Sequence, residues 1–318
     1  MHHLRLLGLS WVAVAALGQG HAGAQITPYG NLDVAVGSFK RFVTPQDPTQ
    51  RVTRVESGLT SGTYIGFKGQ ESLGEDWVAS FKLESSVSVD TGAVSPELWG
   101  RTCELGLAAG GGSVQAGKSL SLSFRTSLLQ SPFTVFRPLG LTGATNFLPF
   151  QSNSVTYSSP ALGGWQVVGQ YGAGEGDGSH DIHALQLLFA PSELALAATL
   201  TQDANRGLFQ IGGSYGDESL KGFGQFARAR NPASEPDLPS GHWHLGVALR
   251  LSDRFRLQSA WTHTVWQAGH HRDAFALVVE EKWAPKFSIY AGTLWQNDQT
   301  GRLESHGSSA FAGGRLKF

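Results

Sequence analysis

The residues best suited to chemistry in this sequence are its eleven histidines, because imidazole binds transition metals and exchanges protons near neutral pH. His242 and His244 lie two positions apart, a spacing that puts both side chains on one face of a strand. Such a pair could bind zinc or copper if a third ligand came from elsewhere in the chain. No cysteine or carboxylate completes the set at a recognisable spacing. We therefore expect no metal site and interpret the histidines as solvated side chains.

Nucleophilic catalysis would need a serine or cysteine beside a base that a third group orients. No spacing of serine, histidine and acid resembles that of outer-membrane phospholipases or proteases, and Cys103 is the only cysteine. A triad can also assemble from distant positions, so this observation disfavours an enzyme without excluding one. The sequence predicts a protein that is not an enzyme and uses no cofactor.

Composition narrows the class of partner. The chain of 318 residues has 24 basic and 25 acidic side chains, and this near-neutral balance disfavours a nucleic-acid partner. A single cysteine cannot form a disulfide within its own chain. Forty-one glycines and one methionine indicate a chain rich in strands and turns and poor in helix.

The elements that must position these residues are strands, because apolar and polar residues alternate in segments of roughly ten residues separated by turn residues. Within 76–85, Trp77, Phe81 and Leu83 share one face while Lys82 and Glu84 share the other. Tilted strands of this length, oily on one face and wet on the other, are typical of an outer-membrane barrel. The pattern predicts an all-β protein, a 16-stranded antiparallel transmembrane β-barrel, with strands at about 26–39, 60–69, 76–88, 100–109, 113–119, 152–159, 164–173, 181–190, 194–202, 207–215, 220–230, 242–251, 254–267, 273–283, 286–297 and 308–318.

Three further patterns favour a barrel over the alternative, a secreted β-sandwich or β-solenoid. Short turns alternate with longer polar loops such as 40–59, 231–241 and 298–307, as they do at the two rims of a barrel. Charges on the polar faces would be intolerable in a dry sandwich core. Aromatic residues also gather near strand ends, as membrane-interface girdles require: Trp77, Trp165, Tyr171, Tyr215, Trp243, Trp283 and Trp295.

The first 24 residues have the three parts of a secretory signal. Arg5 precedes an apolar run at 6–17, and the small residues 22–24 precede a cleavage site. We expect residues 1–24 to be a signal peptide and residues 25–318 to be one outer-membrane barrel domain.

Several blocks, in order along the chain, resemble the trimeric general porins of Gram-negative bacteria, in the branch that includes the neisserial and other β-proteobacterial porins. The start at 26–33 (ITPYGNLD) is similar to the opening strand of that family, and 66–74 (GFKGQESLG) to its second strand and first tight turn. The block 153–160 (NSVTYSSP) is the most specific. The chain ends in an aromatic residue, Phe318, which resembles the signal that the barrel assembly machinery reads.

The resemblance implies a channel that lets small hydrophilic solutes or ions diffuse passively across a Gram-negative outer membrane, built as a homotrimer in contact with outer-membrane lipid. It also implies an inward-folded constriction loop after the fifth strand, which corresponds to about 119–150. That stretch has no acid, although the family usually has acids there; its charges are Arg125 and Arg137, and its aromatic side chains include Phe124, Phe133 and Phe136. The wall facing it would include Asp33, Tyr64, Lys68, Lys82, Glu84, Arg101 and Lys118.

Three questions stay open in the sequence. Arg125 and Arg137 make the constriction anion-leaning unless they pair with wall acids such as Asp33, Glu84 or Glu104. The phenylalanines either form an apolar path for sugars or anchor the loop, and the lack of a polar handle on Phe favours anchoring. The alternation places Lys68 and Lys82 on the inner face. It leaves the direction of Arg101 open, because Arg101 falls on the same side of its strand as the apolar Leu105. The alternative function is an adhesion or structural barrel with a plugged lumen.

Overall fold

The computed structural model describes seven stretches of the chain: 25–40, 51–94, 96–133, 147–175, 181–231, 238–299 and 304–318. The proposed signal peptide lies outside them. Among the described helices, none is both long and apolar enough to cross a membrane.

Nearly all described elements are strands, as the alternation predicts. In chain order they are β1 Gln25–Lys40, β2 Val52–Ser57, β3 Tyr64–Gly74, β4 Trp77–Ser86, β5 Thr102–Ala109, β6 Gly112–Leu120, helix α1 Leu122–Leu129, β7 Phe150–Ser158, β8 Trp165–Gly172, β9 Ile182–Phe189, β10 Leu194–Gln202, β11 Gly207–Gly216, β12 Leu220–Arg230, β13 Pro239–Arg250, β14 Phe255–Trp266, β15 His271–Ala284, β16 Phe287–Gln299 and β17 Glu304–Lys317.

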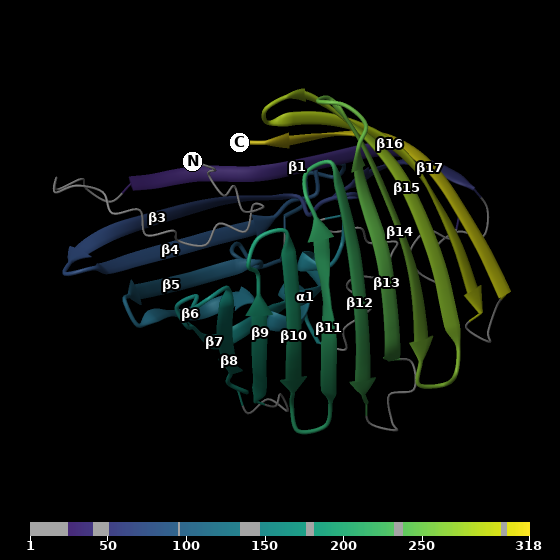
Figure 1. Ribbon diagram of the computed structural model, residues 1–318. Helices are drawn as coiled ribbons and strands as arrows, with labels where there is room; N and C mark the ends of the chain where they lie inside the picture. The colour runs from purple at the N-terminus through teal and green to yellow at the C-terminus, as the bar shows by residue number, and fades with distance from the viewer. Residues whose placement is uncertain are drawn as a thin grey trace.

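The sheet closes on itself because β1 is paired along both edges. β17 lies antiparallel to one edge of β1 and β3 to the other (Figure 1). β2 precedes β3 along that second edge. β2 and β3 are therefore two halves of a single barrel strand. Counted this way, the prediction of a closed 16-stranded antiparallel barrel is confirmed. Closure gives every strand a partner on both sides, which a sheet in hydrocarbon needs because lipid cannot bond to a free edge.

Alternate residues face opposite sides of this wall. On β13, Trp243 and Leu245 are 40% and 59% exposed, whereas His242 and His244 are fully buried on the inner side. The outward side chains are thus apolar and in position to meet lipid. Each aromatic residue expected in an interface girdle is among the exposed large side chains: Trp77, Trp165, Tyr171, Tyr215, Trp243, Trp283 and Trp295.

The second predicted strand differs from the structure. The prediction was one strand at 60–69 after a loop at 40–59, but residues 52–57 already form β2 and the strand resumes only at Tyr64. Ser57 pairs with Val34, and Tyr64 pairs with Asn31. Six residues, 58–63, therefore face only two on β1, and the surplus folds into the barrel. We call Gly58–Thr63 the inward turn.

The outward orientation of the apolar face predicts the effect of a charge placed on it. Leu245→Arg should lower the free energy of unfolding by roughly 2–4 kcal/mol, because a guanidinium near the middle of the bilayer loses its water. Urea titration of the barrel in lipid vesicles measures this change. Ser80→Arg is the control, since Ser80 lies on the inner face of β4 beside Lys82, and a loss of equal size there would contradict the assigned faces.

Candidate pore site

Residues 119–133, which we call the inner segment, comprise the last two residues of β6 and the stretch that leaves the wall after them. Ser121 starts helix α1 by accepting a hydrogen bond from the backbone N–H of Phe124 at 3.3 Å, and Gln130 and Pro132 end it. The helix contacts β9, β10 and β11, and Figure 1 shows it within the ring of strands. Arg137 and Phe136 lie outside the described residues.

Inward-facing glutamines hold the inner segment against the wall. Gln186 on β9 donates to the Thr126 hydroxyl at 2.6 Å, and Gln258 on β14 donates to the Pro132 carbonyl at 2.7 Å. The same face supplies three more donors to this segment: Gln170 to Ser119 Oγ at 3.0 Å, Gln210 to Ser127 Oγ at 3.2 Å and Gln225 to Ser127 Oγ at 3.3 Å. The sequence analysis missed this set, although each glutamine stands at an inner position of its strand.

The phenylalanines of this region are buried rather than presented to solvent. Phe124, Phe133 and Phe147 are 4%, 2% and 6% exposed. Phe133 belongs to an apolar cluster with residues of β1, β14, β15, β16 and β17, and Phe147 packs on Leu208 and Ala227. Their burial supports the anchoring interpretation over an apolar path for sugars.

Arg125 lies on α1 and is 6% exposed. Burial lowers the pKa of its guanidinium to about 9, so the group still carries its charge at neutral pH. Arg125 therefore contributes positive charge to the lumen, although its side chain is buried within the inner segment. Side chains that a passing solute can touch must come from a part of the wall that the inner segment leaves uncovered.

The wall of β3, β4 and β5 carries such groups. Lys68 and Lys82 are register partners on the inner face, and the Lys82 side chain is 40% exposed. The Lys68 ammonium lies 5.1 Å from the centre of the Tyr29 ring. Both lysines thus face the lumen, as their alternation predicts.

Glu84 organises this basic wall. Its carboxylate accepts hydrogen bonds from Tyr29 Oη at 2.7 Å and Thr102 Oγ1 at 3.2 Å, and it pairs with Lys82 at 3.2 Å and Arg101 at 3.3 Å. Glu84 is 4% exposed, so the carboxylate is reserved for these partners. Glu104, the register partner of Lys82, adds a second acid to the same wall.

Arg101 turns inward, which resolves the direction that alternation left open. It lies just before β5, and its guanidinium stacks 4.5 Å from the centre of the Tyr64 ring and 5.0 Å from that of Phe150. Tyr64 therefore serves as a platform for Arg101. Asp33 on β1 is fully buried, and its carboxylate accepts a hydrogen bond from the Ser61 N–H of the inward turn.

Lys118 corrects the predicted wall. Its register partner is Cys103, an exposed residue on the outer face, and its ammonium pairs with Glu97 in the loop between β4 and β5. Gly117 has a φ of +128°, and the register shifts between Gly117 and Ser119. The outer face of β6 thus extends to Lys118, while Ser119 begins the inner segment.

A basic vestibule beyond this wall was also missed. Lys221, Arg256, Lys282 and Lys317 occupy inner positions toward the short-turn ends of β12, β14, β15 and β17. Among the described strands, Glu280 lies at the same level along the barrel axis as these bases, and its carboxylate pairs with Arg315. The sequence did contain a signal for these bases. Each lies an even number of positions from an inward-facing residue of its own strand, such as Gln225, Gln258 or Arg315.

No group of three described His, Cys, Asp or Glu side chains is placed to hold a metal ion. The interpretation of the histidines as solvated is wrong for His242 and His244, which are both fully buried on the inner side. His242 contacts Thr264 Oγ1 at 2.8 Å through Nδ1. One short sequence, 212–216, has the G-x-S-x-G spacing of serine hydrolases, but Ser214 lies inside strand β11 rather than at the turn from a strand to a helix.

A profile of the Gram-negative porins matches residues 10–306. The chain belongs to the Gram-negative porin family. This porin is 30% identical over 178 residues to the major outer membrane protein P.IA of Neisseria meningitidis serogroup C, a match that spans 51% of this chain and 43% of the relative. It is 33% identical over 120 residues to the protein P.IB of Neisseria lactamica, across 36% of this chain and 32% of the relative. The matched parts thus make up less than half of these relatives.

Solved structures show the same fold at low identity. The anion-selective porin from Comamonas acidovorans superposes with a TM-score of 0.80 at 15% identity, covering 93% of this chain and all of the other. The trimer form of OmpT from Vibrio cholerae gives a TM-score of 0.71 at 15% identity with the same coverage. The family and the transmembrane barrel place this porin in the Gram-negative outer membrane, and they point to a channel rather than an enzyme.

The burial of Glu84 predicts a large effect of removing its charge. Glu84→Gln should lower the free energy of unfolding by about 3 kcal/mol, because Lys82 and Arg101 lose a shared buried carboxylate. Urea unfolding measures the loss. Glu97→Gln removes the same charge from an exposed pair with Lys118 and should change stability by about 1 kcal/mol or less. Equal losses in the two variants would contradict the organising role of Glu84.

Proposed function

We propose that this protein is a water-filled channel through which small hydrophilic solutes and ions cross the outer membrane passively, with a preference for anions. The inward-facing basic wall beside an acid-free inner segment carries the proposal. Lys68, Lys82 and Arg101 face the lumen there, and Glu84 and Glu104 only partly offset their charge. A lumen of one sign raises the local concentration of counter-ions because its low-dielectric walls focus the field.

The inner segment is proposed to narrow the channel as the first part of a constriction loop at about 119–150. Neutral amides hold it in place, and its described charge is Arg125. Asp33 and Glu84, two of the acids that could have neutralised loop arginines, are bound to Tyr290 and to Lys82 and Arg101. The basic vestibule of Lys221, Arg256, Lys282 and Lys317 acts in the same direction. The anion selectivity of the porin from Comamonas acidovorans agrees with this preference.

The proposal extends to the ends and partners of the chain. Residues 1–24 are proposed to be a cleaved signal, because Arg5, the apolar run at 6–17 and the small residues at 22–24 form the three parts of one. Phe318 exchanges backbone hydrogen bonds with Gly30 at 3.2 Å, and its role as a signal for the barrel assembly machinery belongs to the proposal. The absence of catalysis and of a cofactor belongs to it as well.

Reversal potentials test both the channel and its charge preference. Purified protein in planar bilayers should give ohmic current steps, and a potassium chloride gradient should give the sign of an anion-preferring pore. Lys82→Glu should move the reversal potential toward cations, because the change places a carboxylate on the inner face. Lys118→Glu is the matched control, since Lys118 faces outward, and it should leave selectivity unchanged.

Three outcomes would count against this function. A barrel without current steps would support the adhesion or structural barrel with a plugged lumen. Clear cation selectivity of the unaltered protein would end the anion preference. Equal shifts in Lys82→Glu and Lys118→Glu would show that the inner wall does not set selectivity.

A homotrimer is the proposed assembly. Ala310, Ala312 and Gly314 form an outward row of small residues on β17, which lets barrels approach closely. A trimer form exists for OmpT, which shares the fold. Light scattering of the detergent-solubilised protein, corrected for bound detergent, should give three chain masses. Ala312→Trp should reduce that mass toward one chain, whereas Leu245→Trp on the outer face of β13 should not. A wild-type monomer that conducts would contradict the trimer and leave the channel intact.

A further inference from the structure

The inward turn is the part of the lumen that the channel proposal leaves unexplained. Its six residues face two on β1, so four are in excess of what an unbroken strand needs. Leu59, Thr60, Ser61 and Thr63 are nevertheless only 2–6% exposed. A surface loop would leave such residues in water, so this segment is packed as a part of the interior.

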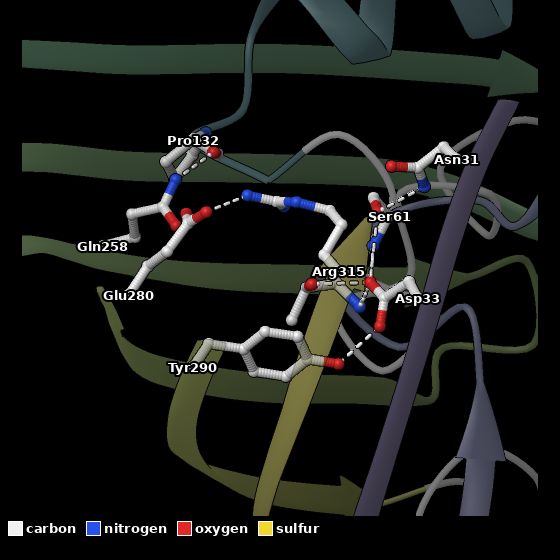
Figure 2. Close-up of polar contacts among 9 residues, drawn as sticks. Asn31, Asp33, Ser61, Pro132, Gln258, Glu280, Tyr290 and Arg315 are labelled. Carbon is white, nitrogen blue, oxygen red and sulfur yellow. Dashed lines mark hydrogen bonds and ion pairs between the residues drawn. The ribbon is translucent and has the colours of Figure 1, made fainter. Parts of the chain in front are cut away.

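One carboxylate holds the turn. Asp33 Oδ2 accepts hydrogen bonds from the backbone N–H and the hydroxyl of Thr60, at 3.0 and 2.7 Å, and from the backbone N–H and the hydroxyl of Ser61, at 2.7 and 3.1 Å. Tyr290, reaching from β16, donates its hydroxyl to Asp33 Oδ1 (Figure 2). Donors on both oxygens require a carboxylate, because an amide would turn its NH₂ group toward one set of donors.

The backbone of β1 and a neighbouring side chain complete the clamp. Asp33 O accepts from the Gly58 N–H at 2.8 Å, and the Thr63 hydroxyl accepts from the Asp33 N–H at 3.1 Å. Asn31 Nδ2 donates to Ser61 Oγ at 2.8 Å and to the Gly62 carbonyl at 2.6 Å (Figure 2). Hydrogen bonds thus hold the turn at its start, middle and end, and we expect it to be rigid.

The two flanks of the turn meet both parts of the candidate pore. On one side, Leu59 belongs to the apolar cluster that also contains Phe133 of the inner segment. On the other side, a Cβ added at Gly62 would lie 3.2 Å from Arg101 Nη1, so the turn passes close to the guanidinium and a side chain at position 62 would crowd it. That guanidinium rests on the Tyr64 ring, and Tyr64 is the first residue after the turn.

We propose that the inward turn is a second narrowing element of the channel, latched by Asp33, and that it positions the Arg101 guanidinium in the aperture. This inference rests on the proposed channel function. The four surplus residues occupy lumen beside Arg101, and Gly62 lies close to its guanidinium on the side away from the Tyr64 ring, whose centre is 4.5 Å from it. Without the turn, Arg101 would keep Glu84 and its ring contacts but lose the surface that limits its movement on the lumen side.

The direct test removes the surplus. Deletion of Leu59–Gly62 leaves Gly58 and Thr63 to pair with Asp33 and Leu32, which restores an unbroken strand. In planar bilayers the deletion should raise single-channel conductance about two-fold, since conductance follows the narrowest cross-section. It should also lower the anion-to-cation permeability ratio, because Arg101 is no longer held in the aperture.

A double-mutant cycle distinguishes positioning from simple widening. Arg101→Gln should lower the permeability ratio in the full-length protein but have little further effect in the deletion background, because both changes remove the same positioned charge. Additive effects would overturn the positioning role of the turn and leave it only a narrowing element.

Point variants keep the inference testable if the deletion fails to assemble. Asp33→Asn and Tyr290→Phe should increase open-channel current noise and raise mean conductance, the former more. Asp298→Asn is the matched control, since Asp298 is also a buried inner carboxylate, 4% exposed, but pairs with Arg272. The control should keep the wild-type conductance.

The outcomes separate this inference from the channel proposal. No current steps from the unaltered protein would end the proposed function itself. A conducting protein whose deletion or Asp33→Asn variant shows wild-type conductance and selectivity would overturn the role of the turn while the channel stands. Noise that rises equally in Asp298→Asn would overturn the latch, because any lost inner carboxylate would then have the same effect.

Discussion

The structure depends on the need of every backbone amide in a membrane to find a partner within the protein. β1 meets this need by bonding to β17 on one edge and to β2 and β3 on the other, which makes the sheet a closed wall. Closure then fixes the side chains, because each residue faces either lipid or the lumen. Polar residues can gather only inside the barrel. The function therefore depends on which side chains and chain segments occupy the lumen.

The segments that occupy the lumen are held there by both polar and apolar contacts. Glutamines of five strands bind the inner segment, and an apolar cluster that includes Leu59 and Phe133 fills the lumen near β14–β17. The buried carboxylate of Asp33 holds the inward turn, and that of Glu84 holds Lys82 and Arg101. Removing one partner of a buried ionic contact costs more than the contact contributes, so such groups specify an arrangement even where they add little stability.

The sequence predicts the wall well and the interior poorly, for a physical reason. Alternation is local, so fifteen of the sixteen barrel strands could be located from neighbouring residues alone. The second strand was misplaced because the Gly, Ser and Thr residues at 58–63 are compatible with a strand and turn inward only through Asp33 and Tyr290, which lie far away in the chain. Lys118 was assigned to the lumen for a related reason, since the register shift beside Gly117 is invisible without the neighbouring strand. Arg101 precedes its strand, so alternation could not direct it.

The chemistry of the two kinds of anchor determines the field in the lumen. Amides and hydroxyls hold the inner segment without net charge, so among the described residues of that segment the buried Arg125 is the one charged side chain. On the opposite wall, Glu84 is shared between Lys82 and Arg101. Glu104 is the second acid there, so the three bases Lys68, Lys82 and Arg101 face two acids and leave net positive charge. The proposed preference for anions therefore follows from the ratio of acids to bases in the fixed contacts rather than from the total charge of the chain, which is close to neutral.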